Sequence, residues 1–229
     1  MNQGKNQIGI LGGSFDPVHM GHIGLAQETH ERFSLDQILF LPVFQSPHKS
    51  HIPLASSIHR MAMLRLALKD NTHFGISDTE MRREEVSYTI DTINRFRLKY
   101  SSSELYLIMG YDNLLDLDLW KDSREIMKNC HILVASRPGL KAFSSTGKIF
   151  GLFNGDSPYR LGKIKNKTQE FIHRETGKKL VVYDISPSDI SSSVVRERLG
   201  FGKSVDNLLP PEVETYIIEH QIYKIGPKL

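Results

Sequence analysis

The strongest constraint on the fold is a regular alternation between short apolar runs and helical patterns along the chain. The apolar runs predict strands at 7–11, 37–41, 74–77, 105–109, 131–135 and 180–185. Apolar residues at helical spacing predict helices near 19–33, 56–68, 89–100, 122–129, 192–199 and 211–220. Strands that alternate with helices need right-handed parallel crossovers. The pattern therefore predicts an α/β fold built on a doubly wound parallel sheet with flanking helices.

Two of the predicted helices have recognisable starts. Ser56 or Ser57 is expected to cap the second helix, and Thr89 the third. One face of the second helix should then be apolar, through Ile58, Met61, Leu64 and Leu68. The third helix aligns Ile90, Ile93, Phe96 and Tyr100 in the same way.

Length and composition point to a single globular unit. The 229 residues carry a formal net charge of +3, with 24% charged and 39% hydrophobic residues, which excludes a disordered or collagen-like chain. No repeat or Pro/Gly/Ser-rich linker divides the sequence, so we expect one domain over 1–229, with a C-terminal helical part at about 186–229.

A reducing, membrane-free location is expected. Cys130 is the single cysteine, which excludes an intrachain disulfide. The longest stretch without Asp, Glu, Lys or Arg runs over 12 residues, from Gln37 to His48, whereas a membrane helix needs about 18. These features predict a cytoplasmic protein.

The positive charge is concentrated in residues 158–179. Seven basic and two acidic residues give this segment +5, so the rest of the chain sums to −2. Only Tyr159 and Phe171 supply aromatic rings there. We interpret the segment as a solvated insertion, and nucleic-acid binding is the less favoured alternative.

A candidate phosphate site follows the first strand, in Gly12-Gly13-Ser14-Phe15-Asp16-Pro17-Val18-His19-Met20-Gly21-His22. Two glycines let the backbone approach a ligand, and the helix that follows offers free N–H groups and its positive dipole end. His19 and His22 share one face of the first helical turn. The alternatives are an ordinary strand-to-helix turn and a His-x-x-His metal pair, which lacks a third ligand nearby.

These eleven residues resemble the signature of the nucleotidyltransferase superfamily that is marked by an H-x-G-H motif. A second resemblance supports the first, because residues 190–196 are similar to the I-S-S-T-x-x-R motif of the same superfamily. Three serine hydroxyls at a helix start, with Arg196 one turn later, form an anion trap suited to a triphosphate. The resemblance implies a Rossmann-like sheet.

Further segments resemble bacterial nicotinate-nucleotide adenylyltransferases in particular. They are Ser46-Pro47-His48-Lys49, Arg60 to Leu64, Ser87 to Ile93, Gly110-Tyr111-Asp112 with Trp120 downstream, Arg137-Pro138-Gly139, and 209–223. Three serines depart from the family pattern: Ser14 and Ser193 stand for threonine and Ser46 for proline. The stretch 140–179 matches nothing that we can assign.

The resemblance implies transfer of AMP from ATP to nicotinate mononucleotide, with release of pyrophosphate. The implied catalytic residues are His19, His22 and Arg196. The implied ATP site comprises Gly12, Gly13, Ser14, Phe15, His19, His22, Ile190, Ser191, Ser192, Ser193 and Arg196. The implied nicotinate-nucleotide site comprises Lys49, Tyr88, Thr89, Asp112, Trp120 and Arg137. Mg²⁺ is expected to arrive with ATP, since no carboxylate cluster suggests a protein metal site.

Several alternatives stay open at this point. The acceptor could instead be nicotinamide mononucleotide or pantetheine phosphate, and a non-catalytic nucleotide- or nucleic-acid-binding protein could keep the same fold. A class I tRNA synthetase fragment is disfavoured, because the chain lacks a K-M-S-K-S-like loop. Individual residues have ordinary alternatives too: Trp120 in the core, Asp112 as a helix cap, and Arg137 and Lys49 as loop cations. A homo-oligomer is neither predicted nor excluded.

Overall fold

The computed structural model describes residues 5–45, 54–136, 145–165, 168–186 and 189–223. Their strands form one sheet of eight, in the order β3-β2-β1-β4-β5-β8-β7-β6. The strands are β1 (Gln7–Gly13), β2 (Gln37–Pro42), β3 (Phe74–Ile76), β4 (Glu104–Gly110), β5 (His131–Ser136), β6 (Tyr159–Lys165), β7 (Thr168–His173) and β8 (Lys179–Asp184). All six predicted strands are present, and the α/β class is confirmed.

Helices occupy the connections between strands. They are α1 (Met20–Phe33), α2 (Ser57–Leu68), α3 (Thr89–Lys99), α4 (Tyr111–Leu115), α5 (Ser123–Asn129), α6 (Ser145–Gly151), α7 (Ser192–Gly200) and α8 (Pro211–Glu219). Three 3-10 turns add η1 (Met81–Arg83), η2 (Leu117–Leu119) and η4 (Leu152–Gly155). The described residues contain no helix that is long and apolar enough to cross a membrane.

The sequence predicted a parallel sheet, but two of the strand pairs are antiparallel. β1 to β5 and β8 run parallel to their neighbours, but β7 pairs antiparallel with both β8 and β6. The basic segment at 158–179 belongs largely to these two strands: most of its described basic side chains are exposed, as a solvated segment should be, but the segment pairs into the sheet and is not an insertion outside it. Only one face of β7 is buried, and most of β6 is exposed, so neither strand forms an apolar run.

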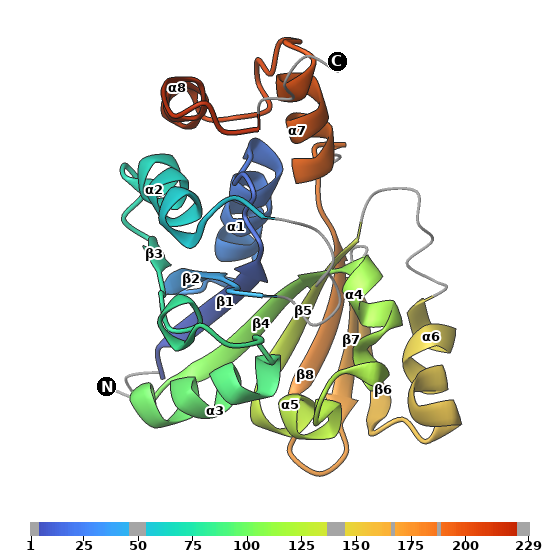
Figure 1. The fold of residues 1–229 in the computed structure, drawn as a ribbon. Coiled ribbons are helices and arrows are strands. Elements are labelled where there is room, and N and C mark those ends of the chain that lie inside the picture. Colours follow the sequence, from blue (N-terminus) through green and yellow to red (C-terminus); the bar gives the residue numbers. More distant parts are fainter. Residues whose placement is uncertain (1–4, 46–53, 137–144, 166–167, 187–188, 224–229) are drawn as a thin grey trace.

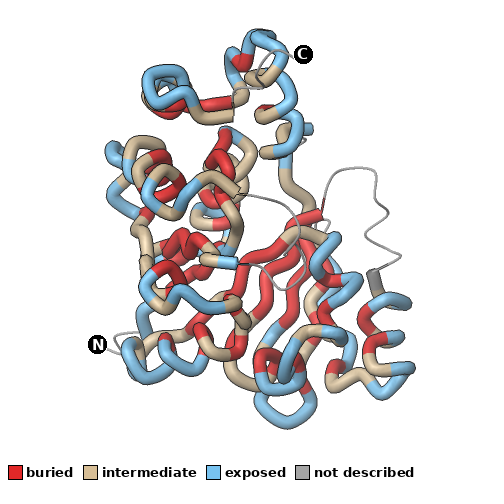
Figure 2. The backbone as a smooth tube through the Cα atoms, in the orientation of Figure 1, coloured by how far each residue is buried: buried red, intermediate tan, exposed pale blue. Residues whose placement is uncertain are grey.

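Two hydrophobic clusters sandwich the sheet (Figures 1 and 2). On one face, α3, α4, α5 and α6 pack on β1, β2, β4, β5, β7 and β8 around a cluster that includes Ile93, Leu107 and Ile132. On the other face, α1, α2, α7 and α8 contribute to a second cluster that includes Phe40 and Val195. The second cluster contains no residue of β6 or β7.

Two details of the predicted helices need correction. Ser56 does cap α2, because its side chain accepts a hydrogen bond from the His59 backbone N–H. Ile58, however, is 76% exposed and does not share the buried face of Met61, Leu64 and Leu68. Thr89 is the first residue of α3 and not its cap, since the N-cap position is held by Tyr88, without a side-chain hydrogen bond.

The order of the strands identifies where a ligand should bind. From β1 the chain winds outward to β2 and β3, and then returns to β4 on the opposite side of β1. Such a reversal opens a crevice at the carboxyl ends of the two central strands. The loop at 14–19 follows β1 there, and α4 follows β4.

Candidate active site

β1 ends in two glycines, Gly12 and Gly13, which lie in different surroundings. A Cβ on Gly12 would meet no atom within 4 Å, so the backbone there is open to a ligand. A Cβ on Gly13 would lie 3.1 Å from the ring of Phe15, so a side chain there would crowd it. Neither glycine has a positive φ; the left-handed residue is Phe15, with φ 46°. The glycines therefore serve close approach, whereas the sharp turn of the chain is made at Phe15.

His19 and His22 lie together at the start of α1. His19 is the N-cap residue, and its ring stacks on that of His22 with centroids 3.7 Å apart. The His19 backbone N–H donates to Nδ1 of His22 at 3.3 Å, which leaves the His22 proton on Nε2. Phe15 packs edge-on against His22 at 5.0 Å. The predicted pairing of the two imidazoles on one face is confirmed.

Burial decides the charge of His19. Its side chain is 5% exposed, and desolvation lowers its pKa from 6.5 to about 4. Its Nδ1 is buried without a hydrogen-bond partner among the described residues. His19 is therefore a neutral imidazole near pH 7, able to form hydrogen bonds with a phosphate without bringing a charge.

The serine-rich segment meets this loop. Ser191 caps α7 by accepting from the Val194 N–H, and the Ser192 hydroxyl donates to the backbone carbonyl of Pro17 at 3.0 Å. Ser193 is exposed, and Arg196 approaches its hydroxyl at 3.4 Å. The three hydroxyls therefore differ in role, since only that of Ser193 is left at the surface for a ligand. Ile190 packs against the second hydrophobic cluster.

Asp16 connects the two segments and was not assigned a role from the sequence. The Arg196 guanidinium donates to its backbone carbonyl at 2.6 Å and lies 3.7 Å from its carboxylate. That carboxylate is 1% exposed and accepts from the Ala55 N–H at 3.2 Å and from the Tyr223 hydroxyl. Asp16 thus ties α7, the segment before α2 and the C-terminal residues to the phosphate loop.

Arg60 is a second positioning residue that the sequence did not reveal. It is 2% exposed and reaches from α2 into the space behind the loop. Its guanidinium donates to backbone carbonyls of several segments: Ser14 at 2.9 Å, Val43 at 2.7 Å, Ala55 at 3.1 Å and Phe44 at 3.2 Å. One side chain therefore holds the phosphate loop against the end of β2.

A second group of predicted residues gathers at the start of α3. The Lys121 ammonium lies 4.6 Å from the centroid of the Tyr88 ring and 3.8 Å from the carboxylate of Asp91. Trp120, beside it, is half-buried and packs on the first hydrophobic cluster. The structure therefore brings Tyr88, Thr89 and Trp120 into one region.

Three predicted residues of the nicotinate-nucleotide site remain: Asp112, Lys49 and Arg137. Asp112 is exposed in the first turn of α4, whose N-cap is Gly110, so Asp112 does not cap that helix. Lys49 and Arg137 lie outside the described residues.

The side chains around the phosphate loop bear on how a divalent metal could be held. Among the described residues, no group of three His, Cys, Asp or Glu side chains gathers to hold an ion. In the loop itself, Oδ1 of the buried Asp16 carboxylate accepts from Ala55 and Tyr223, whereas Oδ2 has no hydrogen-bond partner among the described residues and lies 3.7 Å from the Arg196 guanidinium.

The fold and the two joined motifs define a nucleotidyltransferase of the cytidylyltransferase-like family, which the chain matches over residues 10–198. Within it, the chain belongs to the nicotinate-nucleotide adenylyltransferase family. A probable nicotinate-nucleotide adenylyltransferase of Pelobacter propionicus is 36% identical, covering 96% of this chain and 100% of the relative. One of Geobacter sulfurreducens is also 36% identical, with 95% and 98% covered.

Solved structures agree on the fold. Nicotinic acid mononucleotide adenylyltransferase of Plasmodium falciparum, in complex with NaAD, superposes with a TM-score of 0.70 at 19% identity, covering 95% of this chain and 97% of that one. A putative nicotinate-nucleotide adenylyltransferase of Vibrio parahaemolyticus gives a TM-score of 0.62 at 15% identity, with 96% and 97% covered.

Proposed function

We propose that this chain transfers AMP from ATP to nicotinate mononucleotide, giving nicotinate adenine dinucleotide and pyrophosphate. The observation that carries the proposal is the contact between Arg196 and Asp16, which brings the serine-arginine segment against the phosphate loop at the sheet's crevice. Family membership supports the choice of reaction. We also propose that residues 1–229 form one nucleotidyltransferase domain, since one continuous sheet runs from β3 to β6.

Catalysis needs alignment and charge stabilisation more than a protein nucleophile. The acceptor phosphate attacks the α-phosphorus of ATP, a new P–O bond forms, and the bond to pyrophosphate breaks. His22, protonated on Nε2, and neutral His19 are proposed to donate hydrogen bonds as charge builds on the α-phosphate. The positive end of the α1 dipole and the open backbone at Gly12 serve the same oxygens, whereas the Met20 and His22 N–H groups already donate to the Leu208 and His19 carbonyls.

The triphosphate tail is assigned to the second motif. Arg196 presents a planar fork of donors, which suits phosphate oxygens, and the Ser193 hydroxyl beside it adds another. Ser14 and Phe15 shape the loop, while Ile190, Ser191 and Ser192 fix the start of α7 against it. Magnesium bound to the ATP phosphates would neutralise charge on the leaving pyrophosphate.

The acceptor is assigned to the region at the start of α3. Trp120 and Tyr88 offer aromatic surface for a pyridine ring, and the backbone at Thr89 offers helix N-terminal N–H groups. Asp112, at the end of the neighbouring central strand, is proposed to contact the ribose. Lys49 and Arg137 are proposed to pair with the acceptor phosphate.

The test is pyrophosphate release from ATP and Mg²⁺ with three acceptors: nicotinate mononucleotide, nicotinamide mononucleotide and pantetheine phosphate. Turnover is expected with the first, together with formation of the dinucleotide. The variant His22→Ala, prepared in parallel, reports contaminating activity. Turnover with pantetheine phosphate only would move the chain to another adenylyltransferase type, and release with none of the three would leave a non-catalytic binding protein.

A further inference from the structure

One face of the outer sheet is not covered by any helix of the described chain. On β7 the side chains alternate: Gln169, Phe171 and His173 are buried, with Phe171 packing on Phe150 of α6, and Thr168 and Glu170 lie on the opposite face. The helices of that opposite face pack on the sheet as far as β8, and none of their cluster comes from β6 or β7. The open face therefore lies over β7 and the edge strand β6.

A cavity of about 260 Å³ lies on this face. Strand register fixes its floor, because Tyr106 pairs with His131 across β4 and β5. In the next row, Leu133 pairs with Val181, and Val181 with Glu170. These side chains line one surface, with two rings beside two aliphatic groups. The floor is thus largely apolar and lies near the amino ends of β4, β5 and β8.

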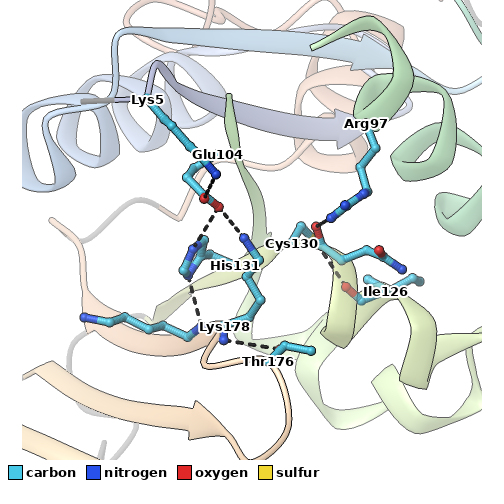
Figure 3. Close-up of polar contacts among 10 residues, drawn as sticks. Lys5, Arg97, Glu104, Ile126, Cys130, His131, Thr176 and Lys178 are labelled. Carbon is cyan, nitrogen blue, oxygen red and sulfur yellow. Dashed lines mark hydrogen bonds and ion pairs between the residues drawn. The ribbon is translucent and has the colours of Figure 1, made fainter. Parts of the chain in front are cut away.

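His131 is held as a neutral ring. Its Nδ1 accepts from the Lys179 backbone N–H at 3.0 Å, and its Nε2 lies 3.5 Å from the Glu104 carboxylate. Glu104 is itself paired with Lys5 and Lys178 (Figure 3). Burial lowers the pKa of His131 to about 4, so the imidazole carries no charge near pH 7. Its ring stacks on that of Tyr106 with centroids 4.7 Å apart and planes 17° apart, and the pair forms a rigid aromatic platform.

Three lysines supply positive charge around this platform. Lys163 and Lys165 reach the cavity from β6, and Lys179 reaches it from β8. The Lys179 ammonium is already paired with Glu170 at 2.8 Å. Lys163 and Lys165 form no ion pair with another described residue, so their charges are available to an anion. Two positions apart on one strand, they can hold one phosphate between them.

We propose that this cavity is a second ligand site, for a planar aromatic anion of mononucleotide size. The ring would pack on Tyr106 and His131, and the phosphate would pair with Lys163 and Lys165. Pockets for drug-sized ligands measure roughly 300–1,000 Å³, so a space of about 260 Å³ is small and favours a mononucleotide over a dinucleotide. The site is separate from the phosphate loop, which follows the carboxyl end of β1.

Calorimetric titration with AMP, nicotinate mononucleotide and inorganic phosphate tests the proposal. We expect two equivalents of mononucleotide to bind. One equivalent should be lost or weakened at least 10-fold in Lys163→Ala/Lys165→Ala, and the other, at the catalytic site, should be unaffected by this change. The control Lys148→Ala/Lys203→Ala removes two exposed lysines elsewhere and should bind as the unmodified chain does. Comparing AMP with nicotinate mononucleotide identifies whether a purine or a pyridine ring is preferred.

The aromatic contribution has its own variant. Tyr106→Leu keeps apolar contact but removes stacking, so mononucleotide binding at the second site should weaken about 10-fold while phosphate binding stays unchanged. Phosphate that binds as tightly as both mononucleotides would overturn the aromatic half of the proposal. A single equivalent of mononucleotide, or full binding by the double lysine variant, would overturn the site itself.

Two further measurements distinguish the second site from an interface between copies and from the catalytic site. If sedimentation shows that the chain self-associates and that Lys163→Ala/Lys165→Ala abolishes the association, this face is an interface between copies and the proposal is wrong. Turnover by the double lysine variant should stay within twofold of normal. If the unmodified chain shows no adenylyltransferase turnover, the proposed function is refuted, but the proposal of a second site is not affected.

Discussion

The guanidinium of Arg196 donates to the backbone carbonyl of Asp16 at 2.6 Å, which joins two motifs that lie 180 residues apart in the sequence. A carbonyl can hold the side chain in place without neutralising it. The Asp16 carboxylate is farther away, at 3.7 Å, and is shared with Ala55 and Tyr223. Arg196 is thus held at the loop with part of its donor fork available to a phosphate.

Replacement of Arg196 by alanine should weaken ATP binding more than acceptor binding, because the fork faces the proposed triphosphate site. Separate Kd measurements for the two ligands decide the point. Arg196→Lys is the informative control, since it keeps the charge but loses the planar fork. Its affinity for ATP should lie between those of the unmodified chain and Arg196→Ala. A larger loss on the acceptor side would show that Arg196 serves the other substrate.

Loss of either stacked imidazole should slow the chemical step. His19→Ala or His22→Ala is expected to lower kcat by roughly 10²–10³ with the fold retained, because donors aimed at the transition-state charge are removed. His73→Ala provides a matched control, since His73 stacks on His30 in a second imidazole pair outside the site. Near-normal turnover of both site variants, with native circular dichroism, would refute their proposed roles.

Acid should destabilise the protein partly through His19. Its pKa is about 4 in the folded chain and about 6.5 when unfolded, so only the unfolded state takes up a proton between these values. The free energy of unfolding is therefore highest above pH 6.5 and falls as the pH drops toward 4, by about 3 kcal/mol at most. Urea titrations at pH 7.5 and 4.5 measure the fall. His19→Asn keeps a good N-cap residue and should reduce it, whereas an unchanged fall would show that His19 does not contribute.

The guanidinium of Arg60 should matter for stability as well as for the site. Arg60→Met keeps much of the buried stem but leaves up to four backbone carbonyls unpaired. Each buried group left unpaired costs about 1–3 kcal/mol, so we expect a loss of several kcal/mol and a Tm lower by roughly 10 °C. Arg60→Lys, with three donors, should lose less. A Tm within 2–4 °C of normal for Arg60→Met, a shift of about 1 kcal/mol, would mean that water replaces the guanidinium.

The sequence predicted those features that depend on neighbouring residues along the chain. The start of α1 at His19 and the joint placement of His19 and His22 followed from a motif at a strand end. β6 and β7 were missed because a strand on an open face needs no apolar run: Lys163 and Lys165 are exposed on β6, and polar residues alternate with buried ones on β7. Ile58 shares the helical spacing of its buried neighbours, but its side of the first turn is exposed among the described residues.

The network around Asp16 and Arg60 could not be predicted for a different reason. Its bonds join residues from the phosphate loop, the end of β2, the start of α2 and the C-terminal segment. Periodicity says nothing of such contacts, since they depend on how distant segments pack. The only local signal was Arg60 itself, an arginine amid apolar residues of a helix whose other face packs on the core.

The surroundings of the proposed pyridine site predict a preference for an acid. The N-terminus of α3 at Thr89 offers backbone donors, and the Lys121 ammonium lies over the Tyr88 ring beside it. A carboxylate gains from both the donors and the positive charge. A carboxamide turns one –NH₂ toward a donor and leaves groups unpaired, at about 1–3 kcal/mol each.

Two such mismatches give a kcat/KM for nicotinate mononucleotide about 10²-fold above that for nicotinamide mononucleotide, at matched ATP and Mg²⁺, because about 1.4 kcal/mol is a factor of ten. Lys121→Gln separates charge from the backbone donors. It should lower kcat/KM for the acid and leave the amide unchanged, since an uncharged substituent gains little from an ammonium group. Equal kcat/KM values for the acid and the amide in the unmodified chain would show that the substrate carboxylate does not bind at the start of α3. A higher kcat/KM for the amide would make nicotinamide mononucleotide the acceptor.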